Sequence, residues 1–324
     1  MQAGCGNELP LERGQLCSVK RWLRPMVQRL REAWYWARFW RGLNGLQGQR
    51  RGLMPPADVI DAGATPQDLW RALQQETPAA GFRQLSLAAD PDGLGGNSYW
   101  QAFRTHYASV GWGREKALEH SLTFQVFDMQ RVRRFCDVAA ATSLVEVAFR
   151  QWLPGVEYWK QDFLYQTDLP HRVIGGLAQK MSDLPAGFFD AMALHCSFEH
   201  FTGSADTEFV AELDRIISPG GACLILPLYI AETHRIYFDP TALSPAVIQG
   251  YDSEAQLYPL YRFGQEHGRY YSPKTLDSRI LSKLPAGLRA TLLHFTGQET
   301  VSPDIYLRFG LVLHRATSIF RWPS

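Results

Sequence analysis

The chain has 324 residues, of which 46% are hydrophobic, which is enough to bury the core of one large or two modest globular domains. Its formal net charge is only +1, so no overall positive field favours nucleic acid as a partner. The five cysteines lack Cys-x-x-Cys spacing, and no stretch reaches the ~18 apolar residues of a membrane span. We therefore expect reduced thiols, no zinc site and a cytoplasmic protein.

Residues 18–51 are strongly basic and rich in tryptophan. Their basic residues, set against the single acid Glu32, are Lys20, Arg21, Arg24, Arg29, Arg31, Arg38, Arg41, Arg50 and Arg51. Apolar residues recur at helical spacing, namely Trp22, Met26, Leu30, Ala33, Ala37 and Trp40. The pattern predicts an amphipathic helix that Gly42 ends, with Pro25 either kinking it or lying in its first turn.

Two interpretations of this helix remain open. In the first, the tryptophans enter an anionic membrane surface, namely Trp22, Trp34, Trp36 and Trp40. In the second, the apolar face packs on the rest of the protein and the arginines are solvated. The first would make the protein peripheral at the inner membrane surface.

Residues 52–98 form a second N-terminal segment. Residues 59–64 have the pattern of a strand, and a helix is predicted to follow, with Thr65 as its N-cap and Pro66 at its first position. The glycine-rich run 93–97 is typical of a flexible linker. We expect residues 1–98 to form an accessory region that carries the basic helix.

A hydrophobic strand over residues 135–138 opens the next region. It contains the acid Asp137 and leads into the small-residue turn 139–143 and then a helical run. This is the first βα unit of a doubly wound sheet, in which ligands bind at the carboxyl ends of the strands. Further strands are predicted at 156–159, 174–176, 186–194, 216–226, 290–295 and 306–314.

The segment that follows the predicted strand at 216–226 has a different pattern. Residues 231–268 are rich in tyrosine and proline without a sustained period, which favours a cap or lid over a bound acceptor. A helix through Leu284 follows, with Ser272 as its cap and Pro273 at its first position.

Three short motifs occur in order along these strands: Phe189-Asp190-Ala191, Leu194-His195-Cys196-Ser197-Phe198-Glu199-His200-Phe201 and Ser218-Pro219-Gly220-Gly221. With the turn after Asp137, they resemble the class I S-adenosylmethionine-dependent methyltransferase family over residues 99–315. The resemblance implies a Rossmann-like α/β domain at 99–316, with a seven-stranded sheet whose last strand is antiparallel and a cap inserted at about 231–268. It also implies methylation of a small-molecule or glycan-type acceptor.

The resemblance assigns a cofactor site. Its residues would be Asp137, the three positions of the turn where the family has glycine (Ala139, Ala141 and Ser143), Asp162 at the ribose, Leu177, Ala178 and His195. Glu157 is an alternative ribose ligand. The replaced glycines motivate an alternative from another class, a non-catalytic methyltransferase-like protein that has lost the cofactor. Asp61 is an alternative position for the first motif.

Catalytic and substrate-binding residues are also predicted. His195, Glu199 and His200 lie within one and a half helical turns, and a histidine there suits proton removal from an acceptor. Two histidines and a carboxylate are also metal-ligand types, but their spacing matches no zinc motif, and a structural role is the further alternative. Arg269, Tyr270 and Tyr271 would contact an anionic acceptor opposite the histidines, or else form a surface ion pair with packed tyrosines.

Overall fold

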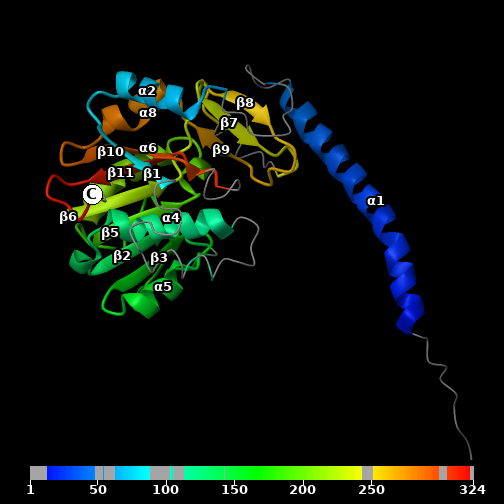
Figure 1. Cartoon of the computed structure of the whole chain (residues 1–324), viewed down its shortest axis with the longest axis horizontal. Coiled ribbons are helices and arrows are strands. Elements are labelled where there is room, and N and C mark those ends of the chain that lie inside the picture. The colour runs from blue at the N-terminus through cyan, green and yellow to red at the C-terminus, as the bar shows by residue number, and fades with distance from the viewer. Residues whose placement is uncertain are drawn as a thin grey trace, which may run out of the picture.

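The computed structural model describes residues 13–47, 54, 63–87, 103, 105, 113–141, 143–242, 251–298 and 305–321. Its centre is an eight-stranded sheet with the order β1-β10-β11-β6-β5-β2-β3-β4 (Figure 1). The strands are β1 (Gly81–Ser86), β2 (Arg134–Val138), β3 (Glu157–Asp162), β4 (Val173–Gly175), β5 (Phe189–His195), β6 (Ile217–Leu226), β10 (Arg289–Thr296) and β11 (Phe309–His314).

The direction of the strands confirms a doubly wound Rossmann-like α/β sheet. Strands β4, β3, β2, β5 and β6 are parallel, and β11 is antiparallel to both of its neighbours, β6 and β10. The chain moves from β2 outward to β4, then returns to place β5 on the other side of β2. The order therefore reverses between β2 and β5, and a crevice at such a switch point is where this class of sheet binds ligands.

The sheet has one strand more than the seven predicted. Strand β1 pairs in parallel with β10, with Gly81 opposite Thr291. Because β1 belongs to the segment expected to be accessory, the boundary predicted at residue 98 is wrong: residues 66–86 are part of the main domain. A short edge strand with mostly exposed side chains has no strong hydrophobic pattern, which is why the sequence did not indicate it.

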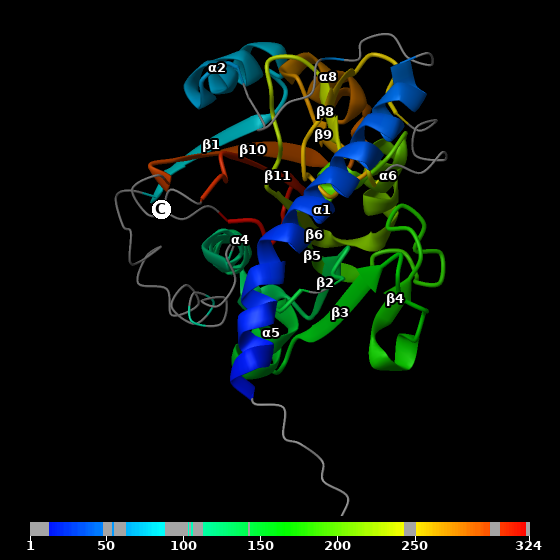
Figure 2. The same ribbon diagram turned by 90° about the vertical axis from the view of Figure 1, so that its right-hand side faces the viewer.

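Helices cover both faces of the sheet (Figure 2). On one face lie α2 (Pro66–Glu76), α6 (Ala205–Ile216) and α8 (Pro273–Arg279), and on the other lie α4 (Gly113–Val126) and α5 (Val145–Trp152). Two apolar clusters result, one containing Leu73, Leu213 and Leu276 and the other Leu122 and Phe149. Burial on both faces explains the nearly continuous apolar run of β5, as expected for central parallel strands.

Two predicted helix starts are confirmed. The Thr65 hydroxyl accepts the N–H of Asp68 at 3.2 Å, and the Ser272 hydroxyl accepts the N–H of Thr275 at 3.1 Å. A proline follows each cap, where its missing N–H costs nothing. The second helix is shorter than expected: α8 ends at Arg279 and a 3-10 turn, η5 (Leu281–Lys283), replaces its last turn.

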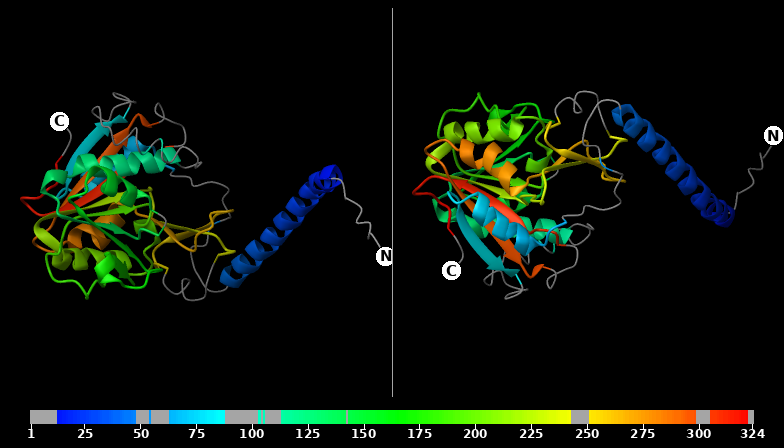
Figure 3. Two further views of the ribbon diagram at one scale, coloured as in Figure 1. Left: turned by 90° about the horizontal axis from the view of Figure 1, so that it is seen from below. Right: turned by 90° about the horizontal axis from the view of Figure 1, so that it is seen from above.

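The expected cap region forms a second, three-stranded sheet. It contains β7 (Arg235–Phe238), β8 (Gln256–Pro259) and β9 (Gly268–Tyr270), in the order β8-β7-β9. Strand β7 is parallel to β8 and antiparallel to β9. This small sheet lies between the main sheet and α1 (Figure 3). Three further 3-10 turns complete the described elements, η2 (Met129–Arg131), η3 (Leu169–His171) and η4 (Phe198–His200).

The basic N-terminal helix, α1 (Arg13–Gln47), runs through both Pro25 and Gly42, so the predicted end at Gly42 is wrong. A Cβ on Gly42 would lie only 2.2 Å from the carbonyl oxygen of Pro240. Glycine is therefore needed for close contact with the small sheet, and the helix continues past it.

The face of α1 that packs differs from the predicted apolar stripe. Phe39 and Leu43 are buried, and the Trp36 ring stacks on Tyr261 with centroids 4.6 Å apart. The Tyr35 hydroxyl donates to Asp239 at 2.7 Å. Leu30, Ala33, Trp34, Ala37 and Trp40 are all exposed. None of the helices in the described part of the chain combines the length and apolar character needed to cross a bilayer.

Candidate functional site at the strand edge

Asp137 of β2 and His195 of β5 meet where the strand order reverses. The His195 Nδ1 lies 3.6 Å from Asp137 Oδ1, and both side chains are almost fully buried. The Tyr158 hydroxyl donates to the other Asp137 oxygen at 2.8 Å. Both residues were predicted for the cofactor site, and the parallel strands carry them to the same edge of the sheet.

The hydrogen bonds of His195 define its tautomer. The Thr123 hydroxyl donates to the carbonyl oxygen of Glu119 at 3.1 Å, so its oxygen is left to accept from Nε2–H of His195 at 2.8 Å. Nδ1 then carries a lone pair, and it has no hydrogen-bond partner among the described residues. A proton at Nδ1 would lie beside the Asp137 carboxylate, which would stabilise the charged ring.

The turn after β2 keeps the shape that glycine would give it. Ala139 has a φ of 54°, in the left-handed region that costs a residue with a Cβ about 1–2 kcal/mol. The N–H of Ala139 donates to the Gln161 side chain at 3.2 Å, and the N–H of Ala141 donates to Asp162 at 2.9 Å. The end of β3 therefore holds the turn in place despite the alanines. Ser143 closes it, and its N–H donates to the Ala140 carbonyl.

Asp162 is buried beneath this turn, and only 2% of its surface is exposed. One carboxylate oxygen accepts the N–H of Ala141 and the other accepts the N–H of Leu164 at 2.9 Å. A carboxylate offers about four acceptor sites, so two remain for a ribose, whose contact stays a prediction. Glu157 lies at the opposite end of β3, where it pairs with Arg134, so it is not an alternative ligand.

Three large apolar side chains are exposed beside Asp162. Phe163 and Leu164 after β3 are each 68% exposed, and Leu177 after β4 is 58% exposed. Gly176 has a φ of 94° and nothing lies within 4 Å of where its Cβ would be, so the edge is open there. Ala178, the other position predicted here, is buried. Sequence reasoning missed Phe163 and Leu164, although an apolar pair directly after an acid at a strand end is a usable signal.

Glu199 and His200 do not share a helix with His195. Strand β5 ends at His195, and Cys196 turns the chain with a φ of 48° before η4 begins. The three residues therefore do not share a helix as predicted, and the Glu199 carboxyl lies 3.5 Å from Nε2 of His200. Burial raises the pKa of Glu199. The described residues contain no group of three metal-ligand side chains that could hold a metal ion.

The structure places a buried polar cluster on α4 that the sequence did not reveal. Lys116 and Glu119 form an ion pair at 2.8 Å, and the Cys196 thiol donates to Glu119 at 3.1 Å. Glu115 accepts the N–H of Tyr306 at 2.9 Å. Burial, and then the neighbouring Glu119, raises the pKa of Glu115 to about 8. The repeat of Glu115, Glu119 and Thr123 at every fourth position was the available signal.

Arg269 is fully buried and does not face an acceptor. Its guanidinium donates to Asp252 and to the carbonyl oxygens of Phe201 and Gly203 at 2.7 to 3.1 Å, and its Nη1 forms an ion pair with Asp206 at 3.0 Å. Tyr271 donates to the same Asp206. An acceptor contact by Arg269 would require this ion network to break, so the structure gives both residues a structural role. Tyr270 faces a different group, the ring of Tyr229 at 4.7 Å.

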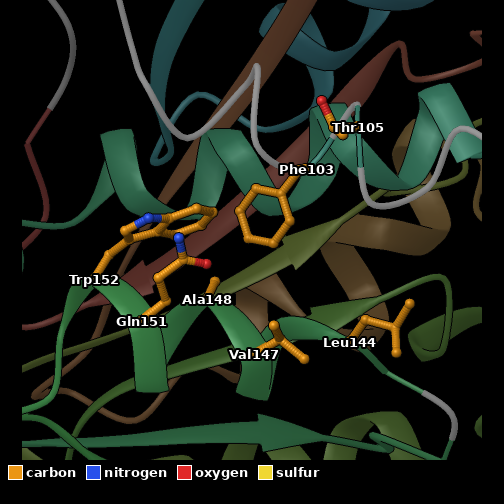
Figure 4. Close-up of a pocket in the computed structure, with 7 residues that line it drawn as sticks. All are labelled: Phe103, Thr105, Leu144, Val147, Ala148, Gln151 and Trp152. Carbon is orange, nitrogen blue, oxygen red and sulfur yellow. The ribbon is translucent and has the colours of Figure 1, made fainter.

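A cavity of about 270 Å³ lies beside the first turns of α5 (Figure 4). Its lining is mostly apolar and comprises Phe103, Thr105, Leu144, Val147, Ala148, Gln151 and Trp152. Leu144 directly follows the turn that ends at Ser143, so the cavity extends from the turn along the outer side of α5. It contains none of the predicted site residues.

No known protein family and no curated protein matches this sequence. Among solved structures, similarity is found to the 1,6-didemethyltoxoflavin-N1-methyltransferase of Burkholderia thailandensis, with 13% identity, 80% of this chain and 93% of that chain covered, and a TM-score of 0.38. An S-adenosylmethionine-dependent methyltransferase from Archaeoglobus fulgidus has 13% identity, 67% and 100% coverage and a TM-score of 0.37.

An O-methyltransferase family protein from Burkholderia thailandensis has 14% identity to this chain. The similarity covers 78% of this chain and 69% of that chain, with a TM-score of 0.35. Identities and scores at this level are low, so the assignment of the fold rests on the strand order and directions of the sheet itself.

Proposed function

We propose that the protein is an S-adenosylmethionine-dependent methyltransferase that acts on a small-molecule or glycan-type acceptor. The observation that carries this proposal is the meeting of Asp137, His195 and the Ala139 turn at the point where the strand order reverses. That crevice is the ligand site of doubly wound sheets. The cofactor, when bound, supplies a methyl group on a positively charged sulfur.

The residues at this edge fit the cofactor in two respects. The turn keeps at Ala139 the left-handed backbone that glycine adopts readily, so the shape of a ligand-binding turn is retained. The exposed Phe163 and Leu177 offer apolar surface to a flat adenine ring, with Asp162 between them and the turn as the ribose ligand. His195 would accept a proton from the acceptor at Nδ1.

A calorimetric titration with S-adenosylhomocysteine tests this proposal. We expect the wild type to bind it and Leu177→Asp to bind at least about tenfold more weakly, because a carboxylate would replace apolar contact with the ring. Leu30→Asp on α1 is the matched control, since Leu30 and Leu177 are 62% and 58% exposed. A folded wild type that binds no S-adenosylhomocysteine would overturn the proposal.

A second candidate is a non-catalytic methyltransferase-like protein. It is favoured by the way the turn is closed from within: both Asp162 oxygens accept backbone N–H groups, and the Tyr165 hydroxyl donates to the Ala141 carbonyl at 2.7 Å. If this closure excludes the cofactor, Tyr165→Phe should restore binding in a protein that otherwise shows none. Binding by the wild type would remove this candidate.

We also propose that the protein is cytoplasmic and that α1 contacts an anionic membrane surface. The support is the face opposite the small sheet, which exposes Val27, Leu30, Trp34 and Trp40. Helix α1 has eight basic residues and one acid, Glu32, and that acid is paired with Arg262 on the small sheet. Exposed tryptophans beside uncompensated arginines suit the interface of an anionic bilayer. Trp36, predicted to take part, is instead packed on Tyr261.

Co-sedimentation with phosphatidylglycerol-containing vesicles tests this contact. We expect binding that falls as salt is raised and that Trp34→Ser weakens, with the exposed Val147→Ser on α5 as control. Deletion of the whole helix is not a clean test, because Phe39 and Leu43 are buried on the small sheet. Equal sedimentation of Trp34→Ser and the wild type, or binding to neutral vesicles only, would contradict the proposal.

A further inference from the structure

Aromatic and acidic side chains gather next to His195, on the side of the small sheet. We call this the tyrosine–glutamate cluster; its members are Glu119, Cys196, Glu199, Tyr229, Tyr270 and Tyr306. They come from five separate parts of the chain: α4, the turn after β5, the segment after β6, strand β9 and the segment before β11. Residues so far apart in sequence converge here because the carboxyl ends of β5 and β6 meet the small sheet.

Cys196 lies at the centre of the cluster. Its sulfur is 3.1 Å from Glu119 Oε1, 3.3 Å from the Tyr306 hydroxyl and 3.9 Å from the Tyr229 hydroxyl. The ring of Tyr229 lies 4.7 Å from that of Tyr270 and 6.4 Å from that of Tyr306 between centroids. Burial, and then the neighbouring Glu119, raises the pKa of Cys196, so the sulfur is a neutral thiol and adds no charge.

The cluster has more carboxyl groups than cations. Lys116 is paired with Glu119, the His200 ring lies 3.5 Å from Glu199, and Glu115 forms no ion pair with another described residue. Glu199 is only 7% exposed, yet its Oε2 has no hydrogen-bond partner within the described residues, and the same holds for Oε1 of the fully buried Glu115. A buried polar atom without a partner is costly, so such atoms mark where a ligand would be bound.

The turn η4, which contains Glu199, packs against β9, which contains Tyr270. Burial, then Cys196 and Glu199, raises the pKa of Tyr229, and burial, then Glu199, raises that of Tyr270. A buried carboxylate beside π-faces disfavours an anion and complements a cation. Arg269, which could have bound an anion, is already paired with Asp206 and Asp252.

We propose that the tyrosine–glutamate cluster binds a cationic nitrogen, so that the acceptor is an amine held by its ammonium group beside His195. Calling the ligand an acceptor rests on the proposed function, but the binding of a cation does not depend on the cofactor. Glu199 is the counter-ion, and Tyr229, Tyr270 and Tyr306 supply the π-faces. Through this contact an amine would be distinguished from an alcohol or carboxylate of the same shape.

Binding of a cation by the tyrosine–glutamate cluster should depend on pH. Burial holds the pKa of Glu199 above its ordinary value, and a bound cation would favour its ionised form, so binding should release protons and strengthen as pH rises toward neutral. The other groups that face Glu199 or its neighbours are Glu115, Lys116, Glu119, Cys196, His200, Tyr229, Tyr270 and Tyr306. Glu199→Gln removes the carboxylate while keeping the shape.

Choline and its neutral carbon isostere, 3,3-dimethylbutan-1-ol, are the probes for the test. Titration of the full-length protein with each, by calorimetry and ligand-observed NMR, should show choline bound roughly tenfold more tightly. Glu199→Gln should weaken choline binding and leave only the part of the preference that the tyrosine faces supply, while binding of the alcohol should be unchanged. The control Glu208→Gln removes an exposed charge on α6 and should leave both unaffected.

The outcomes separate the two proposals. Equal binding of choline and the alcohol by wild-type protein overturns the cationic site, and this comparison needs no variant to fold. A preference for choline that Glu199→Gln leaves undiminished also overturns it, because Glu199 would then not be the counter-ion. Choline selectivity in a protein that binds no S-adenosylhomocysteine supports the site and removes the methyltransferase proposal.

Discussion

The two ends of the candidate site differ in the groups that form them: backbone groups at one end and ionisable side chains at the other. At the edge of β3 and β4, backbone N–H groups of the turn donate to Asp162 and Gln161. The exposed side chains of Phe163 and Leu177 flank them. At the other end, the tyrosine–glutamate cluster buries ionisable side chains in a low-dielectric setting. The first end should therefore tolerate side-chain changes that keep the backbone shape, whereas the second should respond strongly to a change of charge.

The largest expected effect is at the charged end. Glu119→Leu would leave Lys116 buried without its partner, which costs about 3–5 kcal/mol of unfolding free energy. The double variant Lys116→Met with Glu119→Leu removes both charges and should recover most of that loss. Chemical denaturation of the two variants measures it. A single variant no less stable than the double one would show that the pair is not effectively buried.

The next effect is a dependence of stability on pH. Glu115 has a pKa of about 8 in the folded protein, so between an ordinary carboxyl pKa and 8 the folded state binds more protons than the unfolded state. Stability should therefore fall as pH rises through this window, by up to about 1.4 kcal/mol per pH unit. Denaturant melts at several pH values check it. Glu115→Gln should remove the dependence; an unchanged slope would assign it to another group.

A smaller effect is expected at the backbone end. Asp162→Ala leaves the N–H groups of Ala141 and Leu164 without their acceptor and should cost about 1–3 kcal/mol. It should also weaken binding of S-adenosylhomocysteine, because the turn would be released. Thermal unfolding and calorimetry on the same samples separate the two effects. Weaker binding with unchanged stability would mean that Asp162 contacts the ligand but does not hold the turn.

The smallest effect concerns the strained residue of the turn. Ala139→Gly relieves a left-handed φ of 54°, worth about 1–2 kcal/mol, against an entropic cost of about 0.5–1 kcal/mol. We expect a net gain of up to about 1 kcal/mol with the turn unchanged. Ala140→Gly, at a neighbouring position without positive φ, should only destabilise. If both variants lose stability equally, Ala139 is not strained in solution.

Sequence reasoning succeeded where short-range chemistry decides the structure. The caps at Thr65 and Ser272 depend on hydrogen bonds three residues away, so they were predicted with their prolines. Strands β2, β5 and β6 each contain a short apolar run, and each was predicted within a few residues. Asp137 and His195 were each placed at the carboxyl end of a parallel strand, which is a rule of topology, but their contact was found only in the structure.

What the sequence by itself determined is therefore the order of the elements of the sheet and the edge at which a sheet of this class is expected to bind ligands. Only the tertiary structure decided which side chains face that edge. Arg269 lies in the predicted segment, but its guanidinium is paired with Asp206 and Asp252. Trp36 packs on Tyr261, while Trp34 stays exposed. Glu115 and Glu119 belong to α4, a helix whose sequence contains no recognised motif. These outcomes depend on partners distant in the chain, and the energy of a buried charge or ring is set by those partners and by the loss of water around it.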